Sequence, residues 1–275
     1  MARGGRRRPE VEDEAVVLRT APLGEADLLV TLFGRTLGRV RCAARMARRS
    51  TRRFAGGLAV GGRGRARVAL VPGGLGRLHA FVPSKDAPAL SRELRAFACR
   101  GYVAELTDAL LAEGDPDPEV FDALVRAVHV LDDPTGAAVP ILRWYEIVLL
   151  RRLGAMPALD RCAVCGAATD AENVSFAWER GGALCRDHAT GGAGVPAEVL
   201  AAVGSFAAWS GEGRGPELDA ATLRFVRGFL QRALAPHLRR PLRSLSVLRD
   251  LLRDPAGGGP GRAAGSRDET VPRKA

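Results

Sequence analysis

The sequence has no long hydrophobic run. No stretch of about 18 apolar residues, the length that a membrane-spanning helix needs, occurs. Arg143 interrupts the best candidate, and the apolar run Val148–Leu150 ends at Arg151. The arginines at positions 6–8 lead into Pro9 and a short acidic run, so we expect no secretory signal. With 47% hydrophobic and 26% charged residues, the composition is typical of a soluble globular protein.

The first third of the chain has few acidic residues. Residues 1–85 hold 18 Lys/Arg against 6 Asp/Glu, a net charge of +12, whereas residues 86–275 hold 23 against 25, a net charge of −2. Lysine is almost absent, and a GC-rich genome that favours arginine explains that choice but not the imbalance against acid. A region of this charge attracts polyanions, and we expect nucleic acid rather than an anionic membrane surface. A merely solvated basic surface is the alternative.

Short apolar runs separated by Gly and Pro fill residues 15–82. Five such runs predict five strands, and this punctuation favours a small β-barrel. Among five-stranded barrels, the OB-fold is the one that most often binds oligonucleotides. We therefore expect an N-terminal OB-fold with strands at 15–20, 27–33, 39–44, 65–71 and 78–82.

Two of the predicted strands carry arginines at alternate positions, so that on each strand these side chains share one face. Between the two strands, a segment with five arginines in nine residues, followed by glycines, predicts a flexible basic loop. We expect the two strand faces and the loop to form one continuous DNA-binding surface, unless the guanidinium groups point to different sides. The candidate DNA contacts are Arg39 and Arg41 on the third strand, Arg63, Arg65 and Arg67 on the fourth, and Arg45, Arg48, Arg49, Arg52 and Arg53 in the loop.

Helical periodicity replaces the strand pattern after residue 83. Helices are predicted at 87–111, 118–131, 136–153, 196–210, 219–235 and 242–253. In the first of them, Leu94 and Phe97 are placed on the apolar stripe. We therefore expect an α+β multidomain protein, divided into a mobile arm (1–14), the barrel (15–82), a helical domain (83–156 and 193–253), an irregular segment rich in Gly and Cys between the two parts of that domain (157–192) and a disordered tail (254–275).

Four potential metal ligands form two pairs. Two residues separate Cys162 from Cys165, and after 19 further residues Cys185 and His188 repeat the same spacing, which is typical of structural zinc sites. Four protein ligands leave no open coordination position, so we expect structural Zn²⁺ rather than catalysis. A redox Cys-x-x-Cys motif would need a thioredoxin-like setting, and a metal-free thiol cluster is the other alternative. The remaining cysteines and histidines stand alone and are expected to be core or surface residues: Cys42, Cys99, His79, His129 and His237.

Several segments of the chain, in the order in which they occur along it, resemble segments of the RecO family of bacterial recombination mediators and DNA-repair proteins. The resemblance covers residues 14 to about 253. Its most specific part is Tyr145–Leu159, which runs into Cys162–Gly166; the other segments are Ala15–Phe33, Gly38–Arg41 and Leu238–Ser244. The family's pattern implies an N-terminal OB-fold, a helical domain and a zinc-binding insertion at the four ligands above.

The resemblance also implies a function and partners. Members of the family bind single- and double-stranded DNA, anneal complementary strands and cooperate with RecR. Together these proteins help RecA to displace the single-stranded-DNA-binding protein. On this basis we expect a DNA-binding mediator that is not an enzyme and that works in the bacterial cytoplasm, associated with the nucleoid.

Aromatic residues, on which OB-folds commonly stack bases, are scarce. Residues 1–85 contain three phenylalanines: Phe33 and Phe81 are expected in the core, and Phe54, at the end of the basic loop, is the one placed to meet a base. We therefore expect salt-dependent phosphate contact with little sequence preference. Two alternatives stay open: a zinc-containing DNA-processing enzyme, which needs an open metal position or an acidic cluster, and a zinc-ribbon transcription regulator, which needs a recognition helix. No P-loop occurs, so we expect no ATP hydrolysis.

Overall fold

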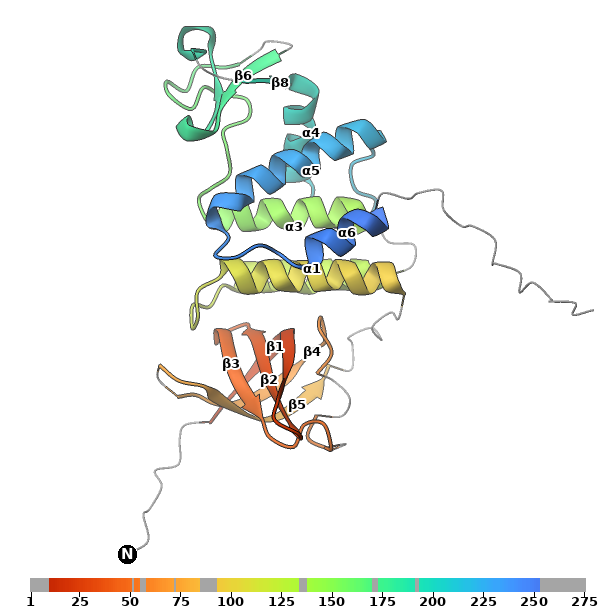
Figure 1. The fold of residues 1–275 in the computed structure, drawn as a ribbon. Coiled ribbons are helices and arrows are strands. Elements are labelled where there is room, and N and C mark those ends of the chain that lie inside the picture. Colours follow the sequence, from red (N-terminus) through yellow and green to blue (C-terminus); the bar gives the residue numbers. More distant parts are fainter. Residues whose placement is uncertain are drawn as a thin grey trace, which may run out of the picture.

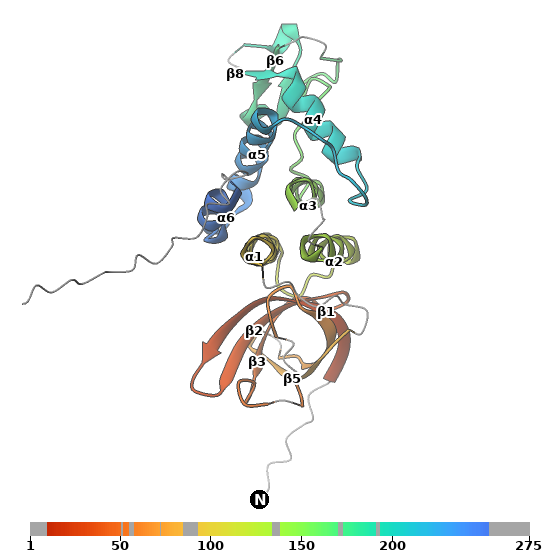
Figure 2. The same cartoon turned by 90° about the vertical axis from the view of Figure 1, so that its right-hand side faces the viewer.

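Three parts are stacked along the long axis of the molecule: a barrel, a layer of helices and a small sheet (Figures 1 and 2). The computed structural model describes residues 10–50, 52–54, 58–71, 73–84, 93–133, 138–169, 173–190 and 193–252. The predicted disordered tail (254–275) and residues 1–9 of the predicted arm lie outside these ranges. Within them, no helix is both long enough and apolar enough to span a membrane.

The five predicted strands form a closed barrel in the order β1-β2-β3-β5-β4. All neighbouring strands are antiparallel except β3 and β5, which meet in parallel. Their inward side chains include Val17, Val30 and Cys42, so the barrel has its own apolar core. The strands are β1 (Glu10–Leu23), β2 (Asp27–Gly34), β3 (Gly38–Ala44), β4 (Arg63–Ala69) and β5 (Gly76–Pro83).

Strand β1 begins earlier than the sequence predicts. Residues 10–14 were assigned to a mobile arm because they are mostly acidic, yet Glu10 pairs with Ala69 of β4 and Glu14 pairs with Arg65. These five residues therefore belong to the barrel. The reason is that β4 supplies both the hydrogen bonds and the opposite charge, which a reading of the local sequence does not reveal.

The barrel packs against the helical layer through the outward side of β1 and β2. Val16, Leu18 and Phe33 join the core of the helices, and the Phe33 ring lies 6.1 Å from that of Phe121. Phe33 is therefore a core residue, as predicted, although of the junction rather than of the barrel interior. Gly38, with φ +64°, adds a close backbone contact, because a Cβ there would come within 2.4 Å of the Asp115 backbone.

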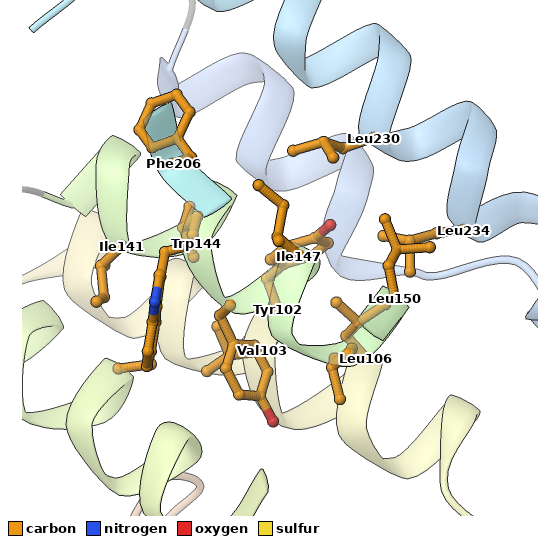
Figure 3. Packing of buried hydrophobic residues seen from close by; sticks show 14 of the residues in the cluster. Tyr102, Val103, Leu106, Ile141, Trp144, Ile147, Leu150, Phe206, Leu230 and Leu234 are labelled. Carbon is orange, nitrogen blue, oxygen red and sulfur yellow. The ribbon is translucent and has the colours of Figure 1, made fainter. Parts of the chain in front are cut away.

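The helical layer contains a helix in each of the six predicted segments, with residues 85–92 outside the description. Figure 3 shows Tyr102 and Leu106 of α1 packing towards Ile147 and Leu150 of α3, with Leu230 of α5 above them. The helices are α1 (Leu94–Leu110), α2 (Pro118–Asp132), α3 (Ala138–Arg152), α4 (Ala197–Ala208), α5 (Ala220–Leu234) and α6 (Ser244–Leu252).

One detail of the first helix differs from the prediction. Leu94 and Phe97 were placed on the apolar stripe, but they are exposed, at 62% and 60%. The stripe of α1 is formed instead by residues further along, such as Cys99, Tyr102 and Val103, which are buried. Ala96 is also buried although it lies between Leu94 and Phe97, so these two side chains are exposed because they lie on another face of α1.

The segment predicted to be irregular contains most of a small antiparallel sheet in the order β7-β6-β8. Strand β6 (Asn173–Ala177) turns through a 3₁₀ segment, Trp178–Arg180, into β7 (Gly182–Leu184), and β8 (Ala193–Pro196) leads directly into α4. Gly181 has φ +86°, the left-handed conformation that this turn requires. Further 3₁₀ segments follow β7 (Arg186–His188) and α5 (Ala235–His237).

Candidate nucleic-acid interface and metal centre

The four predicted metal ligands lie together at the end of the molecule opposite the barrel. Cys162 and Cys165 occupy a tight turn after α3, in which the Gly166 N–H donates to the Cys162 carbonyl at 2.8 Å. Gly166 has φ +76°, as this turn requires. Cys185 follows β7, and the His188 N–H closes the second turn on the Cys185 carbonyl at 3.0 Å. Two turns on opposite sides therefore present two ligands each.

The donor atoms have the spacing of a tetrahedral site. One ligand atom from each of the four residues lies within 4.8 Å of all the others. The Cys165 and Cys185 sulfurs are 3.7 Å apart, and Nδ1 of His188 lies 3.2 Å from the Cys185 sulfur and 3.7 Å from that of Cys162. Metal bonds of about 2.0–2.3 Å give tetrahedron edges of roughly 3.3–3.8 Å. The donor set and its spacing therefore fit zinc.

The protonation of Cys162 also suits a metal ligand. Burial raises the pKa of its thiol, but the backbone N–H groups of Cys185, Cys165 and Val164 point at the sulfur and lower the pKa to about 6. A thiolate is the form that binds a metal ion. The ligand turns border a separate apolar cluster of Cys162, Ala177 and Leu184, whereas Phe176 of the small sheet packs against Phe229 of α5 in the main helical core.

The five loop arginines lie at the end of the barrel away from the helices. All of them are exposed. The loop backbone is held on the β1–β2 turn, since the Met46 N–H donates to Asp27 Oδ1 at 2.7 Å and the Arg48 N–H donates to the Ala26 carbonyl at 3.1 Å. The start of the loop is thus more ordered than the predicted flexible loop.

The charges of the loop arginines are not neutralised by carboxylates within the described part of the chain. Arg48 donates to the Glu25 carbonyl at 3.2 Å, and Arg53 donates to the Arg45 carbonyl at 2.8 Å. A backbone carbonyl accepts a hydrogen bond but carries no net charge. The loop therefore presents five cationic side chains to solvent, which is the arrangement that a phosphate backbone requires.

The arginines of β3 are engaged in the junction. Arg39 is buried: its Nε donates to the Leu111 carbonyl at 3.0 Å, and its Nη1 pairs with Asp108 at 3.1 Å. Arg41 is half-exposed and pairs with Glu113 at 3.2 Å. The prediction that Arg39 lies on an open DNA-binding face is wrong, because the helical layer covers this end of β3.

The arginines of β4 lie beside an acidic stripe. Arg63 donates from Nε to Glu14 at 2.6 Å, and Arg67 is 3.8 Å from Glu10, while Arg65 is exposed. Since β5 separates β3 from β4, the two arginine faces do not meet. The predicted single continuous surface is therefore not formed: the loop carries the free charge, and β4 faces the carboxylates of β1.

Phe54 does not offer a ring for base stacking. Its side chain is 2% exposed and belongs to the barrel core, with the Arg53 guanidinium 5.2 Å from the ring centre. The large apolar side chains that are exposed in the described part of the barrel are Leu23, Met46, Leu75 and Val82, none of them aromatic. Of the predicted core positions, Phe81, Cys42 and Cys99 are buried as expected.

Sequence reasoning missed three further arginines. Arg19 on β1 and Arg239 and Arg240 after α5 line a cleft between the barrel and the helical layer, together with Arg41. The Leu238–Ser244 segment was used only for the family resemblance, and Arg19 stands alone in an apolar strand. For Arg19 the signal was a cationic side chain directly after the buried Leu18, whereas Arg239 and Arg240 have no buried residue directly beside them in the sequence.

Comparison with known families decides what the chain is. The family model "Recombination protein O N terminal" matches residues 1–85, and the family model "Recombination protein O C terminal" matches residues 91–246. The chain belongs to the RecO family. This confirms the resemblance, and the closed five-stranded barrel confirms the predicted OB-fold at the start of this RecO chain.

Relatives of this RecO chain match over most of their length. "DNA repair protein RecO" of Geobacter metallireducens is 35% identical over 240 residues, which cover 86% of this chain and 96% of the relative. The protein of the same name from Myxococcus xanthus is 32% identical with the same coverage. That of Anaeromyxobacter dehalogenans is 40% identical over 196 residues, 70% of this chain and 75% of the relative.

Proposed function

We propose that this chain is a DNA-binding recombination mediator that acts in DNA repair and catalyses no reaction itself. The observation that carries the proposal is the loop of five exposed arginines without carboxylate partners among the described residues. Family membership, and relatives named as DNA repair proteins, support the biological role. The site of action would be the bacterial cytoplasm, at the nucleoid.

The mode of binding follows from the side chains that are available. Guanidinium groups contact phosphates of any sequence, and no aromatic side chain of the barrel that the structure describes is exposed for base stacking. Both single- and double-stranded DNA would therefore bind, with a strong dependence on salt. Such contacts leave the base edges free, which suits the annealing of complementary strands. RecR, RecA and the single-stranded-DNA-binding protein are the proposed partners.

We propose that Cys162, Cys165, Cys185 and His188 hold a structural Zn²⁺. The metal would hold the two ligand turns together, where the separate apolar cluster consists of only Cys162, Ala177 and Leu184. Because all four positions would be filled by protein, a zinc nuclease is less well supported. The basic charge lies on a barrel loop rather than on a helix, which also favours the mediator over a zinc-ribbon regulator.

The zinc proposal has a direct test. Protein purified without chelators should contain one zinc per chain by elemental analysis, and Cys162→Ser should lower this content. Hydrogen exchange in residues 157–190 should then rise before that of the barrel, because metal binding supplies the folding energy of the small sheet. A native protein without zinc would overturn the assignment, and Cys42→Ser is the control because Cys42 is far from the cluster.

The mediator proposal is tested by annealing. Complementary oligonucleotides labelled with a donor and an acceptor dye should anneal faster with the protein, both bare and coated with single-stranded-DNA-binding protein, and RecR should enhance the second reaction. Intact strands should be recovered on a denaturing gel. Shortened strands would indicate a processing enzyme instead, and an unchanged annealing rate would contradict the mediator role.

A further inference from the structure

A cleft lies where the barrel meets the helical layer. It has a volume of about 430 Å³ and is formed by the outer face of β1–β2–β3, the end of α1 and the coil between α5 and α6. Figure 1 shows this coil passing along α1, above the barrel. Residues far apart in the sequence therefore build one concave surface, which we call the junction cleft.

The junction cleft is lined by more positive than negative charge. Five arginines face two carboxylates, a formal excess of three positive charges. Asp108 is shared by Arg39 and Arg240 at 3.1 and 3.0 Å, and Glu113 pairs with Arg41 at 3.2 Å. The two remaining arginines are Arg19 and Arg239, both exposed and without a carboxylate partner in the part of the chain that the structure describes.

Strand register connects the junction cleft with the basic loop. Arg19 of β1, Thr31 of β2 and Arg41 of β3 form one row across the outer face. The next row towards the loop consists of uncharged residues. From Arg41 the strand then reaches Arg45 in four residues, a distance of about 13 Å. The outer row on the loop side of Arg41 is Ala21, Leu29 and Ala43, of which Ala21 and Leu29 still line the cleft.

We propose that the DNA path continues from the basic loop across the β1–β2–β3 face into the junction cleft, where Arg19 and Arg239 bind backbone phosphates. The inference rests on the proposed DNA-binding function and adds a second contact region to it. A polyanion suits this surface because two free guanidinium groups lie beyond an uncharged stretch that repels neither phosphate nor sugar. Since Arg239 belongs to the helical part, a DNA strand bound along this path would contact both the barrel and the helical layer.

The test compares short and long single strands. An oligonucleotide of about 6 nucleotides lies within the roughly 4–16 nucleotides that one OB-fold covers, and one of about 20 nucleotides exceeds that range. The double variant Arg19→Gln/Arg239→Gln should bind the long strand about tenfold or more weakly, with a log–log salt slope flatter by up to about 2. Its affinity for the short strand, which the loop alone accommodates, should stay the same. The charge-matched control is Arg214→Gln/Arg224→Gln. Both arginines are exposed; Arg214 precedes α5 and Arg224 lies on it.

A second readout locates the contact without mutation. Long single strands should protect Arg19 and Arg239 from an arginine-specific reagent such as phenylglyoxal, as read by mass spectrometry, whereas short strands should protect the loop alone. Equal long-strand affinity in the double variant and control, or no protection of these two arginines, would overturn the junction cleft as a DNA site. A wild-type protein that binds neither strand would instead contradict the proposed function itself.

Discussion

The basic loop holds five candidate arginines, and the two arginine-bearing strands together hold another five. The surroundings of the two groups are very different. The loop guanidiniums that have protein partners bond to backbone carbonyls, as Arg48 and Arg53 do. On the strands, Arg39 and Arg63 pair with carboxylates. The difference teaches that the charge available to DNA depends on pairing in three dimensions rather than on the number of arginines.

The largest effect is expected from the loop. The variant Arg48→Gln/Arg49→Gln/Arg52→Gln/Arg53→Gln removes four unneutralised charges, so DNA affinity should fall by about 30-fold or more. The log–log salt slope should become flatter by about 3–4, because each lost phosphate contact releases one counterion fewer. Fluorescence anisotropy over a series of salt concentrations measures both. An unchanged salt slope would show that the loop does not contact DNA. The loop and the strands would then not differ in the charge that they offer to DNA.

The second prediction concerns Arg39, which is expected to matter for stability. Replacing it with Met leaves the nearly buried Asp108 carboxylate with Arg240 as its remaining partner. The substitution removes one of the two ion pairs of a nearly buried carboxylate and the hydrogen bond to the Leu111 carbonyl, so the free energy of unfolding should fall by about 2–3 kcal/mol. Urea denaturation measures this change. Arg65→Met, at an exposed β4 position, is the control and should change the free energy of unfolding by less than about 0.5 kcal/mol. An equal loss in both variants would contradict the structural role of Arg39.

The third prediction turns the β4 arginines into available charge. Glu10→Gln and Glu12→Gln together remove two carboxylates of the acidic stripe beside β4. DNA affinity should then rise severalfold at low salt, and the gain should disappear at high salt because exposed charges are screened. Glu179→Gln/Glu198→Gln, in and beside the small sheet, is the matched control. A gain of the same size in this control would mean that net charge alone, and not the stripe, governs binding.

The smallest effect is expected on β4 itself. Arg63→Gln/Arg65→Gln/Arg67→Gln should lower DNA affinity less than about threefold, because Glu14 and Glu10 already pair with two of these arginines. The same titrations that test the loop measure it. A loss as large as that of the loop variant would show that the carboxylates leave the β4 face open to DNA.

Much of the fold was predictable because its signals are local. Glycines and prolines between short apolar runs marked the five strands. Asp117 and Pro118 marked the start of α2, and the Asp117 side chain does accept the Val120 N–H at 3.0 Å. The Cys/His cluster that could hold a metal ion was predictable for the same reason, since each pair of candidate ligands lies on a single turn.

The errors concern residues whose partners are distant. Glu10 and Glu14 looked like part of a solvated arm because their neighbours on β4 lie about fifty residues away; Glu14 and Arg63 are 49 positions apart. Arg39 looked like a surface residue because nothing near it in the sequence indicates that α1 covers it. Phe54 looked exposed because a basic loop precedes it, yet its side chain fills the barrel core.

The sequence alone therefore determined the kind of partner, the barrel and the positions of the metal ligands, because charge, alternation and ligand spacing are properties of neighbouring residues. Only the tertiary structure decided which arginines stay available. Closing the barrel puts β1 beside β4, and docking the helices puts Asp108 against Arg39. The same docking leaves Arg19 and Arg239 facing one cleft, a pairing of positions 220 residues apart that no local pattern encodes.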